Sequence, residues 1–120
     1  MGLPGTHRMT RSGEYAAVRT KGTARSGRLM TLAFLADETP AAIRFGFTIT
    51  KRVGNAVHRN KLRRRLREIA RHAAPSIQRP GRLVTIPRPI ASEVTFAEIQ
   101  SEWQYLARKL GLIPPASSSP

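Results

Sequence analysis

"GNAVHRNKLRRRLREIAR", residues 54–71, is the most densely charged stretch of the chain and the one around which its predicted fold is organised. Asn55 can cap a helix that starts after Gly54, and Pro75 limits that helix to at most about 18 residues. A step of 100° per residue gathers its apolar residues on one stripe: Leu62, Leu66, Ile69, Ala70 and Ala73. A helix of this length needs a buried face, so we expect this stripe to pack on a sheet.

The same helix carries a second stripe, which is polar and mostly basic, about a third of a turn away. Its members are Asn60, Arg63, Arg64, Arg67 and Arg71. Like charges four residues apart repel by roughly a few tenths of a kcal/mol per pair, and Glu68 is the only acid nearby in sequence. Phosphates would supply the missing counter-charge. The stripe therefore predicts a polyanion-binding surface; the alternatives are a solvated helix face and a nuclear-localisation run.

The composition of the whole chain agrees with a polyanionic partner. Lys and Arg total 21 against 7 Asp and Glu, which gives a net charge of +14. Arg supplies 17 of these cations, and its planar guanidinium suits phosphate oxygens better than the point charge of Lys. A GC-rich genome would also enrich Arg codons, so this bias has a second explanation.

Length and residue types bound the remaining possibilities. A chain of 120 residues fits one domain with one core. Without Cys there is no disulfide and no thiolate metal site, which fits a reducing compartment, and we expect a soluble, cytoplasmic protein. We find no apolar run that would serve as a signal peptide or membrane span.

The rest of the chain predicts two further helices and several strands. Ser12 can cap a helix through Lys21, with Gly22 as its stop. Residues 28–36 and 81–87 are short apolar strand candidates, and residues 43–50 alternate apolar with polar side chains. Thr95 and Glu98 form a capping box for a last helix, whose apolar stripe is Phe96, Ile99, Trp103, Leu106 and Leu110. Trp103 is interpreted as a core residue rather than a base-stacking one.

The order and spacing of residues 51–68, "KRVGNAVHRNKLRRRLRE", resemble the signature of the protein subunit of bacterial ribonuclease P. The matching positions are Lys51, Arg52, Gly54, Asn55, Ala56, Val57, Arg59, Asn60, Lys61, Arg63, Arg64 and Arg67. The resemblance covers about residues 8–111. It implies an α+β fold of a single domain, with a central, mostly antiparallel sheet of about four strands, element order α-β-β-β-α-β-α and a left-handed βαβ crossover. Handedness rules alone would favour the right-handed crossover.

The resemblance also implies a function. Proteins of that family bind a large catalytic RNA and the 5′ leader of precursor tRNA, and the RNA with bound Mg²⁺ hydrolyses the phosphodiester. The expected partners are ribonuclease P RNA and precursor tRNA, with no membrane and no DNA. The RNA-binding residues implied here are Lys51, Arg52, Asn55, Arg59, Asn60, Lys61, Arg63, Arg64, Arg67 and Arg71, and those of the leader cleft are Tyr15, Arg19, Arg44 and Thr48.

Two positions depart from the family pattern. The family places aromatic residues four apart on the first helix; Tyr15 matches the first of them, but Arg19 stands at the second. Ala33 stands where an aromatic is often found on the first long strand. We therefore expect a leader cleft that binds less by stacking and more by charge.

Catalysis by the protein itself is not expected. Its seven acids are dispersed, and the pair Glu98 and Glu102, one helical turn apart, is more typical of a solvated face than of a metal site. His58 and His72 are interpreted as surface residues of the basic helix, and no P-loop or nucleophile motif is present.

Domain organisation follows from these elements. We predict a flexible basic arm at 1–9, a ribonuclease P protein domain at 10–113 and a disordered tail at 114–120. The alternative function is that of a small ribosomal or RNA-assembly protein that binds structured RNA without catalysis; a DNA-binding protein is disfavoured because no helix-turn-helix spacing is present.

Overall fold

The computed structural model describes Met9 and residues 12–37, 42–77 and 79–114. Along the chain lie α1 (Ser12–Lys21), β1 (Thr23–Ser26), β2 (Met30–Ala36), β3 (Ile43–Phe47), α2 (Ala56–Ala73), β4 (Gly81–Pro87) and α3 (Phe96–Lys109), with short 3-10 helices η2 (Lys51–Val53), η3 (Ala74–Ser76) and η4 (Pro89–Glu93). The predicted α+β class and element order are confirmed. None of the described helices is both long and apolar enough to cross a membrane.

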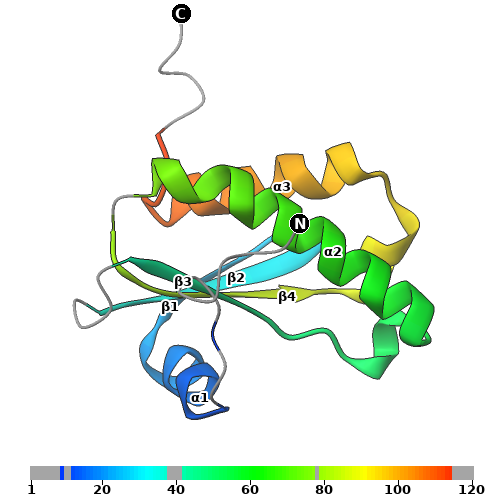
Figure 1. Cartoon of the computed structure of the whole chain (residues 1–120), viewed down its shortest axis with the longest axis horizontal. Coiled ribbons are helices and arrows are strands. Elements are labelled where there is room, and N and C mark those ends of the chain that lie inside the picture. Colours follow the sequence, from blue (N-terminus) through cyan, green and yellow to red (C-terminus); the bar gives the residue numbers. More distant parts are fainter. Residues whose placement is uncertain (1–8, 10–11, 38–41, 78, 115–120) are drawn as a thin grey trace, which may run out of the picture.

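The sheet has the strand order β1-β2-β4-β3. β2 pairs antiparallel with both β1 and β4, whereas β3 and β4 are parallel neighbours. Parallel neighbours need a crossover, and α2 supplies it above the sheet (Figure 1). Seen along the direction in which β3 and β4 run, the chain turns counter-clockwise as it passes from β3 over α2 to β4. The crossover is therefore left-handed, as the family resemblance implies.

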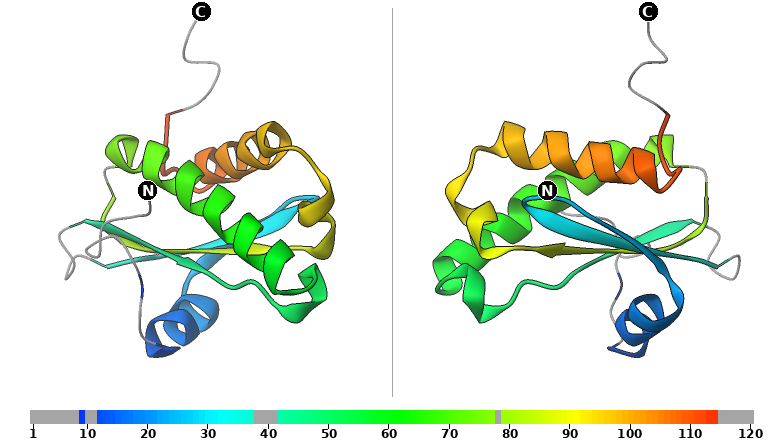
Figure 2. Two further views of the ribbon diagram at one scale, coloured as in Figure 1. Left: turned by 45° about the vertical axis from the view of Figure 1, so that its right-hand side comes forward. Right: turned by 180° about the vertical axis from the view of Figure 1, so that it is seen from behind.

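Helices cover both faces of the sheet (Figures 1 and 2). α2 and α3 lie side by side on one face and enclose the main core, and α1 lies on the other over a smaller cluster of Met9, Val18, Ala33 and Val84. Trp103 of α3 is fully buried, and its indole N–H donates to Thr85 Oγ1 at 3.0 Å. Its predicted role in packing is confirmed.

The basic helix forms as its sequence predicts. Asn55 precedes the first residue, and its side-chain oxygen accepts a hydrogen bond from the His58 backbone N–H at 3.0 Å. The helix runs for 18 residues and then tightens into η3, which contains Pro75. Of the apolar stripe, Leu62, Leu66, Ile69 and Ala70 are buried, and Ala73 packs against the core from a half-buried position.

The strands differ from the prediction in three places. β1 has no sequence signature because all four of its side chains are exposed. β2 begins at Met30 rather than at residue 28, because Arg28 and Leu29 belong to the turn after β1, which is closed by a hydrogen bond from the Gly27 N–H to the Met30 carbonyl at 2.8 Å. β3 ends at Phe47, although the apolar alternation continues to residue 50.

Both predicted terminal segments fall mostly outside the described residues. The arm at 1–9 is described only at Met9, which is buried and donates its backbone N–H to the Phe45 carbonyl at 2.9 Å. The tail at 114–120 is described only at Pro114, which is exposed.

Candidate nucleic-acid interface

The basic stripe of α2 faces away from the core. Asn60 and Arg64 are exposed, and Arg63 and Arg67 are half-buried. Arg63 Nη1 donates to Asn60 Oδ1 at 3.0 Å, which holds one guanidinium along the helix surface. Because the first turn of α2 contains no Asp or Glu, the partial positive charge of the helix N-terminus adds to the field of these cations.

The loop before α2 is joined to the helix by specific contacts. Gly54 has φ 147°, a conformation that favours glycine, and a Cβ there would approach the His58 side chain at 3.1 Å. Arg59 Nη1 donates to the Gly54 carbonyl at 3.0 Å. Lys51 and Arg52 of η2 stay exposed beside this junction. These contacts join the loop that carries Lys51 and Arg52 to the first turns of α2.

Arg71 differs from the other cations of the stripe because it has a carboxylate partner. Its Nη2 lies 2.5 Å from Glu68 Oε2, and His72 Nε2 lies 2.8 Å from the same oxygen. The hydrogen bond from Arg71 is the main cause that lowers the pKa of Glu68 below its usual value of 4.5, and the same bond raises the pKa of Arg71. Glu68 thus competes with any external anion for Arg71.

Two other cations of α2 are placed apart from the stripe. Lys61 is exposed on the opposite flank, where it lines a small hollow with His58, Arg65 and Ser92 of η4. Arg65 Nη1 donates to the Val94 carbonyl at 3.2 Å, so this arginine ties α2 to the segment before α3. On the helical wheel Arg65 borders the apolar stripe on the side away from the basic stripe, which brings it beside the segment before α3.

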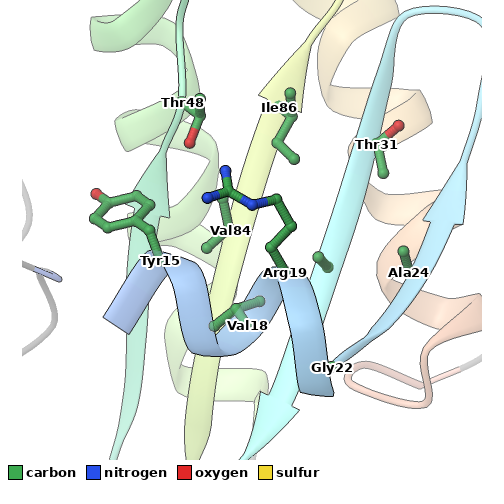
Figure 3. A pocket seen from close by; sticks show the side chains of 10 residues that line it. Tyr15, Val18, Arg19, Gly22, Ala24, Thr31, Thr48, Val84 and Ile86 are labelled. Carbon is green, nitrogen blue, oxygen red and sulfur yellow. The ribbon is translucent and has the colours of Figure 1, made fainter. Parts of the chain in front are cut away.

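A cleft of about 380 Å³ lies between α1 and the sheet (Figure 3). Three of the four residues assigned to the leader cleft line it together: Tyr15, Arg19 and Thr48. The fourth, Arg44, shares their sheet face but is not part of the lining. A Cβ on Gly46 would meet the Tyr15 ring at 2.7 Å, so that ring rests directly on the β3 backbone between the Arg44 and Thr48 positions.

The floor of this cleft is made of small and aliphatic side chains. Its members are Ala24, Ala33, Val84 and Ile86. Figure 3 shows the Arg19 side chain extending from α1 over this floor. A planar group could enter against an apolar surface, with the Tyr15 ring on one side and a guanidinium beside it.

The cleft continues toward the basic loop. A second hollow of about 290 Å³ shares Thr31 and Ile86 with it and reaches Thr50, Arg52 and Arg88. Arg88 Nε donates to the Gly27 carbonyl at 3.1 Å. The sequence carried no signal for Arg88 beyond its charge, because its place at the end of the groove depends on the pairing of β2 with β4.

Most of the described carboxylates are engaged within the protein. Glu102 accepts three backbone N–H groups, Asp37 pairs with Arg82, and Glu98 lies 3.6 Å from Arg28. No group of three or more His, Asp or Glu side chains that could hold a metal occurs among the described residues.

Comparison with known proteins agrees with these features. The family model for ribonuclease P matches residues 3–111. The ribonuclease P protein component of Microcystis aeruginosa is 36% identical over 117 residues, which are 94% of this chain and 98% of that protein. That of Acidothermus cellulolyticus is 34% identical over 112 residues, 90% of this chain and 91% of that one. The fold matches the RNase P protein of Staphylococcus aureus with a TM-score of 0.84 at 22% identity, covering 90% and 98% of the two chains.

Proposed function

Because this chain belongs to the ribonuclease P protein family, the protein component of a ribonucleoprotein endoribonuclease of tRNA processing, we propose that α2 and its preceding loop bind the ribonuclease P RNA. The observation that carries this proposal is the separation of cations from carboxylates on α2. Asn60, Arg63, Arg64 and Arg67 follow one another along one side of α2, and the only acid of that helix, Glu68, lies against Arg71 and His72.

Phosphate is the counter-ion that fits this surface. Each phosphate neutralised by Lys or Arg releases condensed counterions, so binding is strong at low salt and weakens as salt rises. The guanidinium fork also allows two parallel hydrogen bonds to one phosphate. In the proposal this surface is extended at the helix N-terminus by Lys51, Arg52 and Asn55. Arg59 stabilises the loop by donating a hydrogen bond to the Gly54 carbonyl. In this proposal Lys61 contacts RNA from the opposite flank of α2, and Arg71 contributes less because Glu68 competes for it.

The cleft under α1 is proposed to receive the 5′ leader of precursor tRNA. Tyr15 supplies one stacking surface, Thr48 a hydroxyl and Arg19 a cation for a leader phosphate or base. Arg44 would contact the leader farther along β3, beyond the ring of Tyr15. The hollow that continues to Arg52 and Arg88 gives the leader a path toward the RNA bound on α2.

The protein's role is to bind and orient, and the chemistry is assigned to the RNA. Phosphodiester hydrolysis would be carried out by the RNA subunit with the Mg²⁺ that it binds. The described carboxylates support this division, because Glu102 is turned onto backbone N–H groups, Asp37 onto Arg82, and Glu68 onto Arg71 and His72. We place this assembly in the cytoplasm, where precursor tRNA is processed.

Reconstitution tests the proposal. The full chain is combined with a bacterial ribonuclease P RNA at low Mg²⁺, and cleavage of precursor tRNA is mapped at its 5′ side. We expect the chain to stimulate cleavage at the mature 5′ end over RNA alone. A chain that binds the RNA without any stimulation would instead act as an RNA-assembly protein, and the proposal would be wrong.

A further inference from the structure

A groove on the outer side of α3 is separate from both surfaces described above. It has a volume of about 530 Å³ and runs between α3 and the turn that joins β1 to β2. Its lining on α3 repeats at helical spacing: Ala97, Ser101, Tyr105 and Arg108. Since α3 packs over β2 and β1 whereas α2 contacts β3, the groove and the α2 stripe lie at opposite edges of the helical layer (Figure 2).

Tyr105 is the central feature of this groove. Its side chain is 51% exposed, in contrast to the fully buried Trp103 two residues earlier. Lys109 Nζ lies 5.4 Å from the centre of its ring, which is within cation–π range. An exposed aromatic ring with a cation over it offers a stacking surface in a positive field.

Further cations surround the ring. Arg28 and Arg108 line the groove. Arg25 on β1 pairs with Leu32, whose side chain is buried beneath the helices, so Arg25 lies on the α3 side of the sheet edge. Three positive charges therefore belong to Arg28, Arg108 and Lys109 at the groove, and Arg25 adds a fourth on the adjoining strand.

The two carboxylates of the groove do not cancel this field. The Glu102 carboxylate accepts hydrogen bonds from the backbone N–H groups of Arg28, Leu29 and Met30, with N···O distances of 2.6 to 3.1 Å. Glu98 is 3.6 Å from Arg28 in an exposed pair, a kind of contact worth little in water. The two lining arginines are matched by these two acids, and Lys109 over the ring of Tyr105 with Arg25 on the adjoining strand gives the region a net positive charge beside an exposed aromatic ring.

We propose that this groove is a second RNA-binding site, in which an unpaired nucleotide stacks on Tyr105 while Arg25, Arg28 and Arg108 contact its flanking phosphates. Cations beside an exposed ring are the combination that binds single-stranded nucleic acid. An acidic protein partner would use the cations but has no need for the ring. A strand held there is distinct from the RNA on α2, because the two surfaces face opposite edges of the molecule.

Photocrosslinking in the reconstituted holoenzyme tests the site. A photoreactive phenylalanine replaces Tyr105 in the full chain, which is then irradiated with ribonuclease P RNA and precursor tRNA. We expect a covalent adduct with RNA. An adduct with a second copy of the chain would identify a dimer interface, and no adduct would mean a solvated surface; either result overturns the proposal.

Affinity for a short oligoadenylate gives a second readout. Tyr105→Phe keeps the ring and should bind like the wild type, whereas Tyr105→Leu should bind about tenfold more weakly, because an aliphatic side chain offers no ring on which a base can stack. Ser101→Ala, in the same groove, is the matched control and should change nothing. Equal affinity of the Phe and Leu variants would exclude stacking.

A failure of the proposed α3 site can be told apart from a failure of the proposed RNA binding by α2. Arg63→Ala in α2 should weaken binding of ribonuclease P RNA whether or not Tyr105 is used. If the α2 variant loses affinity while Tyr105→Leu does not, the α3 site alone is wrong.

Discussion

Gly46 is the residue on which the shape of the α1 cleft most directly depends. A Cβ at this position would lie 2.7 Å from Tyr15 Cε1 and 2.9 Å from Met9 Sδ. We expect Gly46→Val to displace the Tyr15 ring, to lower the free energy of unfolding by about 1 to 3 kcal/mol and to weaken leader binding. Thermal unfolding and leader titration measure both effects.

Gly13→Ala is the control for this substitution. A Cβ at Gly13 meets nothing within 4 Å, and the residue lies in α1, where Ala is favoured over Gly by up to about 1 kcal/mol. It should leave the stability equal or slightly higher. Equal tolerance of both substitutions would mean that Tyr15 does not rest on β3 as described.

Arg19 is the residue that should make leader binding depend on salt. With an arginine where relatives carry a second aromatic, leader affinity should fall more steeply with salt than in those relatives. Arg19→Phe should flatten the slope by about 0.7, the value for one phosphate contact to a single strand. Lys21→Ala removes a cation from the same helix outside the cleft lining and should leave the slope unchanged. An equal slope in Arg19→Phe and the wild type would contradict this role.

Among the elements, α3 is held to the β1–β2 turn mainly by the carboxylate of Glu102, which accepts three backbone N–H groups. Glu102→Ala would leave three backbone N–H groups without their acceptor, and we expect the free energy of unfolding to fall by about 2 to 3 kcal/mol. Glu98→Ala, one turn earlier, removes an exposed pair and part of a capping box and should cost less than about 1 kcal/mol. Denaturant unfolding measures the free energy of unfolding of both variants. Similar losses would show that Glu102 stabilises the fold no more than Glu98 does.

On α2, the pair of Glu68 with Arg71 predicts a pH dependence. Because this contact lowers the folded-state pKa of Glu68, its contribution to stability is complete above the usual value of 4.5 and is lost as pH falls through the lower folded-state pKa. NMR titration of the Glu68 carboxyl should show the lowered pKa, and Arg71→Ala should raise it. Titration of wild-type Glu68 at or above its usual value would exclude the contact.

The elements also show what the sequence can predict. α2 was predictable to its ends because its signals are local: Asn55 caps it, Pro75 limits it, and the apolar and basic stripes follow from the helical period. β1 was not located, because an edge strand with four exposed side chains has no apolar alternation. The role of Glu102 depends on a turn more than 70 residues earlier in the chain, so a solvated face was the natural but incomplete interpretation.

For the candidate leader cleft, only the grouping of its residues can be compared with the structure, and their contact with RNA stays a prediction. Tyr15, Arg19 and Thr48 line one cleft as the family resemblance implies, whereas Arg44 lies outside its lining because Tyr15 covers the strand between Arg44 and Thr48. The link from the cleft to Arg88 could not be read from the sequence, since it requires the register of β2 against β4.

At the scale of the whole molecule, the two proposed RNA-binding surfaces lie on opposite faces of the sheet. α2 presents its basic stripe on one face, and the cleft under α1 lies on the other (Figure 1). The groove past Thr31 and Ile86 connects the cleft with the loop that precedes α2. A leader held in the cleft can thus be presented to an RNA held on α2 by a single small domain.

The salt dependence of binding to ribonuclease P RNA tests the central claim most directly. We compare the wild type with the triple variant Arg63→Ala, Arg64→Ala, Arg67→Ala, and with Arg65→Ala, whose guanidinium is turned onto the Val94 carbonyl. The triple variant should fold, because Ala favours the helix and the substitutions relieve repulsion. Its plot of log affinity against log salt should be flatter by about two to three units, at roughly 0.7 to 0.9 per phosphate. The Arg65 control should keep nearly the wild-type slope. A triple variant with an unchanged slope would show that these arginines do not contact RNA phosphates.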